Sequence, residues 1–437
     1  MSTLLIRGGR IIDPSQNLDK VGDLVLKDGV VAGIDVQGVQ PDEVIDADGL
    51  LVVPGLVDCQ VALREPGFEE AETIQTGTAA ALAGGVTSVA CLPDTSPVVD
   101  NRAAAEFIQL QSARAGHCHV FPLGAVTKGH KGEELAEIGQ LVEGGAVGFT
   151  EGKQAVANAE VLRRALQYTR MFDRPILCHP QVPELVQDGV MHEGFHSTLL
   201  GLRGMPTAAE EVMTMRDIAL AELTNGRIHL MCLSTAGSVD LVRRAKQRGI
   251  PITASVAVHN LLLTDEALKT FDPNYKVNPP LRTQRHVDAL VEGLKDGTID
   301  VVTADHQPWP EELKDREITL APFGISGLET LLSLAARALI EPGFLTWPQL
   351  IEKLAVAPAK VLGLNKGTLQ VGADADVTLI HPNLEWEIDP QQFYSKSRNT
   401  PFAGWKVTAR VTHVFVGGRL RYTLEQGILE SADKNAV

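Results

Sequence analysis

The stretch LLVVPGLVDCQVALREPG, residues 50–67, decides the fold of this chain. Its apolar first part is typical of a buried strand, and the strand ends by presenting Gln60 and Ala62. Side chains alternate along a strand, so these two residues point the same way. At the carboxyl end of a parallel strand, where active-site loops begin, the chain therefore presents an amide and a methyl group as a pair.

Seven further apolar segments alternate with helical patterns, which predicts βα units and a parallel sheet. Eight parallel strands with outer helices close into a barrel. An open doubly wound sheet is the alternative, but no glycine fingerprint follows the first strand. The seven segments are VTSVACLPD (86–94), HVFPLGAVT (119–127), AVGFT (146–150), PILCHPQ (175–181), RIHLMCLST (227–235), PITASVAVH (251–259) and DVVTADHQP (300–308).

The two ends of the chain differ from its middle, because both consist of short β-like pieces broken by turns. We therefore predict an α/β protein with two parts. Residues 53–364 are expected to form a (β/α)8 barrel of the TIM type. Residues 1–52 and 365–437 are expected to meet as one small, discontinuous β domain.

Composition narrows the class of protein. The 437 residues are 44% hydrophobic, enough for a large core, and carry a formal charge of −16, which argues against nucleic acid or an anionic membrane as partner. No apolar run approaches the roughly 18 residues of a membrane span, and we expect no signal peptide. Five scattered cysteines fit a reducing compartment, so we expect a cytoplasmic protein.

Polar residues gather at the ends of the eight predicted strands, where a barrel places its chemistry. Together with Ala62, they are the candidate site residues of this sequence. They are Gln60, Arg64, Asp94, Glu151, His179, Cys232, His259, Asp305 and His306.

Ten short motifs follow one another along nearly the whole chain: GLVD (55–58), LREPG (63–67), TGTAAALAGG (76–85), HEG (192–194), STAGS (234–238), NPPLR (278–282), DGTID (296–300), TADH (303–306), APFGISGLET (321–330) and NTPFAGW (399–405). In this order they resemble the blocks of the dihydroorotases, a family of the amidohydrolase superfamily. Arg64 together with NPPLR and the GLET motif favours this family over its relatives, the hydantoinases and allantoinases.

The resemblance implies metal-assisted hydrolysis of a cyclic amide. Members typically bind zinc through a His-x-His pair after the first strand, a carboxylate or carbamylated lysine after the fourth, and histidines after the fifth and sixth. An aspartate after the eighth strand binds metal and moves the proton. Zinc takes N, S or O ligands and lowers the pKa of its bound water toward 7.

This sequence departs from that ligand set. Gln60 and Ala62 stand at the His-x-His pair, and Cys232 stands at a ligand histidine. The resemblance therefore implies that no metal is bound, with Asp305 as a vestigial general base. At most one zinc ion is expected, and its residual candidate ligands are Glu151, His179, Cys232 and Asp305.

Substrate recognition is altered as well. Arg64 and Asn278 match positions that hold the substrate carboxylate in the family, and His259 belongs to the same set. Asp94 replaces an asparagine there. A second carboxylate beside the bound one is repulsive.

Three functions follow from the resemblance and its departures. We prefer a non-catalytic, dihydroorotase-like protein of pyrimidine biosynthesis that is a structural partner of the aspartate carbamoyltransferase catalytic chain, as a homodimer or larger oligomer. The first alternative is an active dihydroorotase, or a related cyclic amidohydrolase, with a mononuclear zinc site. The second is a scaffold that binds a small acid through Arg64 and Asn278.

Overall fold

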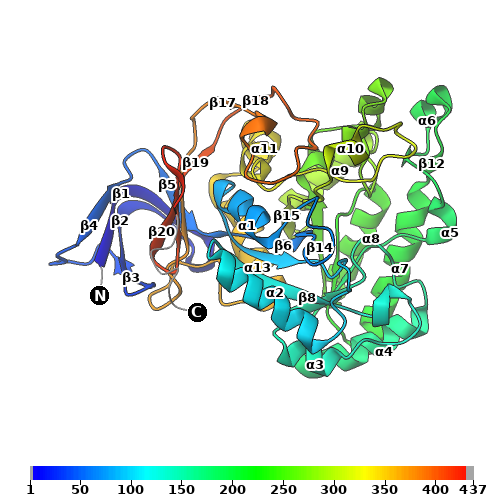
Figure 1. Cartoon of the computed structure of the whole chain (residues 1–437), viewed down its shortest axis with the longest axis horizontal. Coiled ribbons are helices and arrows are strands. Elements are labelled where there is room, and N and C mark those ends of the chain that lie inside the picture. The colour runs from blue at the N-terminus through cyan, green and yellow to red at the C-terminus, as the bar shows by residue number, and fades with distance from the viewer. Residues whose placement is uncertain (1–2, 430–437) are drawn as a thin grey trace.

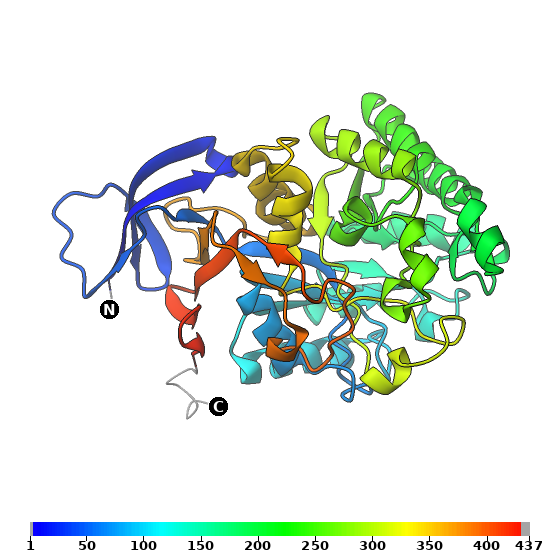
Figure 2. The same cartoon turned by 90° about the horizontal axis from the view of Figure 1, so that it is seen from above.

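The computed structural model describes residues 3–429 as two adjoining parts, a barrel and a twisted β-sheet (Figure 1). The view from above also places the sheet beside the barrel (Figure 2). The sheet draws strands from both ends of the chain. Residues 1–2 and 430–437 of the predicted small domain lie outside the described residues, and the predicted domain boundaries stay a prediction.

The barrel contains eight strands, and each hydrogen-bonded neighbour pair is parallel. Their order in the sheet follows the chain, so the predicted fold class is confirmed. The strands are β6 (Leu56–Val61), β7 (Val86–Cys91), β8 (His119–Ala125), β9 (Gly148–Thr150), β10 (Ile176–Cys178), β13 (Ile228–Leu230), β14 (Ile252–Ala257) and β15 (Val301–Thr303).

Asp58 links the first barrel strand to the last. Its carboxylate accepts hydrogen bonds from Thr303 Oγ1 (2.6 Å) and from the backbone N–H of Ala304 (2.8 Å). The N–H of Ala62 donates to the carbonyl of His306 across the same seam (3.0 Å). Burial raises the pKa of Asp58 to about 6. These bonds bring the ends of β6 and β15, and therefore Gln60 and Asp305, to one side of the barrel.

Helices surround the barrel (Figure 1). Four of the main outer helices begin at a capping side chain, as where Thr73 accepts from Thr76 N and Asn101 accepts from Ala104 N. No helix among residues 3–429 is long and apolar enough to cross a membrane. The main outer helices are α1 (Ile74–Ala83), α2 (Arg102–Ala115), α4 (Ala159–Thr169), α7 (Thr207–Thr224), α8 (Ala236–Gln247) and α9 (Gln284–Lys295).

The second sheet has nine strands, which come from both ends of the chain. Their order is β21-β20-β19-β16-β5-β1-β2-β3, with β4 paired to β1. The stretch around residue 55 belongs to both sheets, since β5 lies in this one and β6 in the barrel. A side chain at Gly55 would collide with Thr87, so glycine is required between them. The strands are β1 (Thr3–Asp13), β2 (Leu18–Lys27), β3 (Val30–Ile34), β4 (Glu43–Asp46), β5 (Leu51–Pro54), β16 (Val377–His381), β19 (Arg410–Val416), β20 (Arg419–Thr423) and β21 (Gly427–Ile428).

Candidate functional site

Gln60, at the end of β6, is bonded to its neighbours in the barrel. Its Nε2 donates to Cys232 Sγ (2.7 Å) and to Asp305 Oδ1 (3.3 Å), and its Oε1 accepts from Ser255 Oγ (3.2 Å). Ala62 is fully buried and offers no donor or acceptor from its side chain. Of the pair that the sequence singled out, Gln60 therefore lies in the site and makes internal contacts there, whereas Ala62 packs in an apolar cluster with Cys59 and Leu92.

Lys153 is the residue that sequence analysis missed. It follows the short strand β9, and its Nζ lies 2.5 Å from Asp305 Oδ1, 3.1 Å from the carbonyl of Asn278 and 4.0 Å from Cys232 Sγ. Two signals were available: its position in GFTEGK, two residues after Glu151, and the family's use of a carboxylate or a carbamylated lysine after the fourth strand. We call Gln60, Lys153, Cys232 and Asp305 the centre.

The charges in the centre are mutually dependent. Burial opposes the ammonium form of Lys153, but Asp305 outweighs it and holds the pKa of Lys153 above its ordinary value. Burial likewise opposes ionised Asp305, yet Lys153 holds the pKa of Asp305 below its ordinary value. Burial raises the pKa of the Cys232 thiol. The centre thus holds a carboxylate–ammonium pair beside a neutral thiol.

Glu151 does not point into the centre. Its two carboxylate oxygens accept from the backbone N–H (2.7 Å) and the hydroxyl (3.0 Å) of Thr127, and burial raises its pKa to about 7. His179 and His259 are buried with no hydrogen-bond partner on either ring nitrogen. Burial lowers the pKa of His179 to about 3 and that of His259 to about 4, so both rings are neutral.

A zinc ion does not fit this arrangement. Within residues 3–429, no group of three or more His, Cys, Asp or Glu side chains is placed to hold a metal ion. Of the four residual candidates, Glu151 faces Thr127, Cys232 accepts from Gln60, and Asp305 is paired with Lys153. Among these four, His179 alone has both ring nitrogens without a hydrogen-bond partner. The candidate ligands are therefore near the end of the barrel but do not converge.

Three of the four predicted substrate residues, Arg64, Asp94 and Asn278, line a cavity of about 380 Å³ and are already bonded within the chain, whereas His259 is not among the lining residues. Arg64 donates to the Pro308 carbonyl, to Asp94 and to Gln307, and its guanidinium stacks on Trp309. The amides of Asn278 and Gln181 bond each other in both directions, at 2.8 and 3.1 Å. Besides these groups, the cavity is lined by Phe68, Lys153, Asp305, Pro322, Phe323 and Gly324.

Three site residues adopt a left-handed backbone that non-glycine residues seldom take. The φ angles are +62° at Arg64, +51° at Cys232 and +48° at Asp305. Local hydrogen bonds hold two of them, since Cys232 N donates to Ser255 Oγ (3.0 Å) and Asp305 N donates to Thr303 Oγ1 (3.1 Å). Such conformations concentrate at functional sites.

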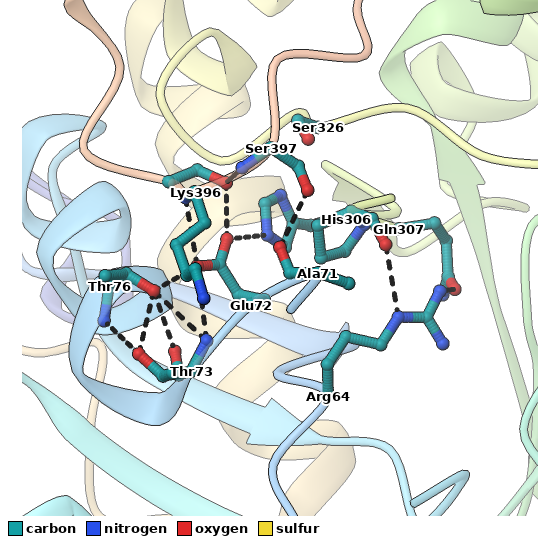
Figure 3. Close-up of polar contacts among 12 residues, drawn as sticks. Arg64, Ala71, Glu72, Thr73, Thr76, His306, Gln307, Ser326, Lys396 and Ser397 are labelled. Carbon is teal, nitrogen blue, oxygen red and sulfur yellow. Dashed lines mark hydrogen bonds and ion pairs between the residues drawn. The ribbon is translucent and has the colours of Figure 1, made fainter. Parts of the chain in front are cut away.

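A second polar cluster surrounds Glu72 (Figure 3). The buried carboxylate of Glu72 accepts from the Thr76 and Ser395 hydroxyls and lies 3.4 Å from His306 Nε2. His306 Nδ1 accepts from Gly327 N (3.1 Å), so Nε2 is the nitrogen that carries the proton. We call Glu72, Thr76, His306 and Ser395 the Glu72 cluster; it joins α1, the end of β15 and the segment near residue 395.

Comparison with known proteins agrees with the fold and the motifs. The family described as Dihydro-orotase-like matches residues 49–238. A dihydroorotase of Pelotomaculum thermopropionicum is 51% identical over 95% of this chain and 98% of its own, and one of Syntrophotalea carbinolica is 48% identical over 96% and 99%.

Among solved structures, the L-hydantoinase of Arthrobacter aurescens superposes with a TM-score of 0.89 at 24% identity, covering 98% of each chain. At that identity the superposition supports the fold alone. The identity of about half over almost the full length of the dihydroorotases carries the assignment. The chain belongs to the dihydroorotase family of the amidohydrolase superfamily.

Proposed function

We propose that this chain is a cytoplasmic, non-hydrolytic member of the dihydroorotase family that serves pyrimidine biosynthesis as a structural partner of the aspartate carbamoyltransferase catalytic chain. The observation that carries the non-hydrolytic part is the bonding of Gln60 to Cys232 and Asp305. An amide and a methyl group occupy the positions of the His-x-His pair, and Cys232 and Asp305 each contact Gln60 and Lys153.

Hydrolysis of a cyclic amide needs a strong nucleophile and a free general base, and the groups of this site provide neither. A metal ion makes hydroxide at neutral pH by lowering the pKa of bound water, and the described donors do not converge on a metal. A general base must also reach the proton that it takes. Asp305 instead holds Lys153 at 2.5 Å.

The partnership with aspartate carbamoyltransferase rests on the resemblance together with this changed centre. A barrel whose shape is kept while its chemistry is lost is expected to be used for its surfaces, since fold and function are separable. We propose a homodimer or larger closed oligomer as the form that contacts the carbamoyltransferase subunits.

A second candidate is an active dihydroorotase that uses one zinc ion. The relatives that are 51% and 48% identical carry the name dihydroorotase, and family membership by itself favours this candidate. The contacts of Gln60, Glu151 and Lys153 favour the first. The two candidates differ in turnover and in bound metal.

One paired experiment tests the proposal. The purified chain is assayed in both directions, with dihydroorotate and with carbamoyl aspartate, in the presence of added zinc. The Pelotomaculum relative is the matched control. We expect no turnover by this chain; turnover of about 1 per second or more, typical of enzymes, would overturn the first candidate and support the second.

The proposed partnership is tested in the organism that produces this chain. Tagged protein is expected to co-purify with the aspartate carbamoyltransferase catalytic chain, and deleting the gene is expected to reduce that enzyme's activity or apparent size in extracts. Unchanged activity and size after deletion would contradict the partnership.

A further inference from the structure

Lys153 reaches the groups that the family resemblance places around a metal ion. Its Nζ is 2.5 Å from the carboxylate of Asp305 and 4.0 Å from Cys232 Sγ, and it donates to the Asn278 carbonyl at 3.1 Å. The side chain is 20% exposed, whereas that of Asp305 is 3% exposed. The ammonium therefore enters the centre from the cavity side.

We infer that Lys153 is a built-in cation that takes the place of the metal ion in this barrel. A buried carboxylate requires a compensating charge, because an isolated ion in the protein interior is very unfavourable. In the described part of the chain, Lys153 is the cationic side chain paired with Asp305. It supplies this charge through a covalent tether, so the centre needs no free ion.

The same ammonium would exclude a divalent ion. Two positive charges a few ångströms apart repel strongly where solvent is largely excluded. A zinc ion bound to Asp305 Oδ1 would have to displace Lys153 from the same oxygen, and Gln60 from it as well. The inference goes beyond the proposed function because it names the group that replaced the metal, and it rests on the proposed absence of metal-dependent hydrolysis.

The test is a double-mutant cycle on thermal unfolding with Lys153→Met, Asp305→Asn and the double variant. Each single variant leaves one buried charge or its partner unpaired, so each is expected to lower Tm by roughly 5 °C or more. The double variant removes both charges and is expected to lose clearly less than the sum of the single losses. Strict additivity would overturn the inference.

A matched control pair lies elsewhere on the barrel. Lys246 Nζ is 2.7 Å from Asp300, with about a quarter of each side chain exposed (24% and 22%). Lys246→Met is expected to shift Tm less than Lys153→Met does, because solvent screens its pair. An equal or larger shift for Lys246→Met would contradict the special position of Lys153. If Lys153→Met does not fold, the double variant decides: the inference requires that it folds.

A metal arm completes the experiment. The unmodified chain is incubated with zinc and then dialysed. We expect it to retain well under one zinc ion per chain, and we expect a chelator to leave its Tm unchanged. Retention of one zinc ion per chain, with a Tm that falls on chelation, would overturn the inference. The outcome is separable from the proposed function, since the cycle reports on the Lys153–Asp305 pair whatever the assay and the co-purification give.

Discussion

Asp305 and His306 are neighbours in the chain, yet their side chains belong to two different clusters. Asp305 faces the centre, where it contacts Lys153 and Gln60; His306 faces Glu72 and Gly327. In the Glu72 cluster, the polar contacts join three distant segments of the chain and need no ion. In the centre, the family's metal positions hold groups that bond one another. The comparison indicates that two adjacent residues at the end of one strand can belong to separate polar clusters.

The largest effect on stability is expected from Glu72→Ala. Glu72 is fully buried and contacts Thr76, His306, Ser395 and the backbone N–H of Lys396. Removing it leaves several buried donors unpaired, which should lower the free energy of unfolding by about 3–5 kcal/mol. Urea denaturation measures this.

Glu72→Gln, which keeps the shape and one acceptor, is the control and should lose less. An exposed ion pair contributes up to about 1 kcal/mol. If Glu72→Ala lowers the free energy of unfolding by less than that, the Glu72 cluster is no more important than an ordinary surface contact.

A smaller effect, dependent on pH, is expected from Glu329→Gln beside the Glu72 cluster. Burial raises the pKa of Glu329 to about 8, and its carboxyl accepts from Ser395 N at 3.2 Å. The folded pKa lies above the unfolded value of about 4.3, so the folded state binds the proton more tightly. Stability from this group is therefore lost as pH rises from about 4 to about 8.

Glutamine cannot ionise, so Glu329→Gln should gain stability relative to the unmodified chain at about pH 9, on the order of 2–3 kcal/mol. The two proteins should differ little near pH 5. Urea denaturation at both pH values measures the difference. The same difference at both pH values would show that ionisation of Glu329 is not the cause.

The smallest effect is expected when the family's His-x-His pair is restored at positions 60 and 62, because we expect no gain of turnover. The double variant Gln60→His, Ala62→His still has Lys153 on Asp305 and a thiol at Cys232. We expect no hydrolysis of dihydroorotate with added zinc, with circular dichroism confirming that the variant folds. Turnover within about 100-fold of the Pelotomaculum relative would show that the centre lacked only two ligands.

Much of this arrangement could be predicted from the sequence because it depends on periodicity. Alternating apolar strands and helical patterns predict the barrel, and the alternation of side chains puts Gln60 and Ala62 at its end. The contacts of the loops could not be predicted. Whether Glu151 or Lys153 reaches the centre depends on how the chain turns after β9, and residues two apart there point to Thr127 and to Asp305.

The reciprocal pairing of Asn278 with Gln181 was also beyond the sequence, because residues nearly a hundred positions apart form it. The family resemblance implied that Arg64 and Asn278 would lie at one site, and both line the same cavity. It gave no sign that each would already be bonded within the chain.

The left-handed backbone at Arg64, Cys232 and Asp305 has a consequence for protein engineering. Bending a non-glycine residue into this region costs about 1–3 kcal/mol, and designed barrels seldom contain such bends. This chain holds three of them at the end of one barrel, and two of these, Arg64 and Asp305, line the same cavity. For a designer who wants a new reaction in a barrel, the difficult backbone geometry is already present, and the work that is left concerns side chains alone.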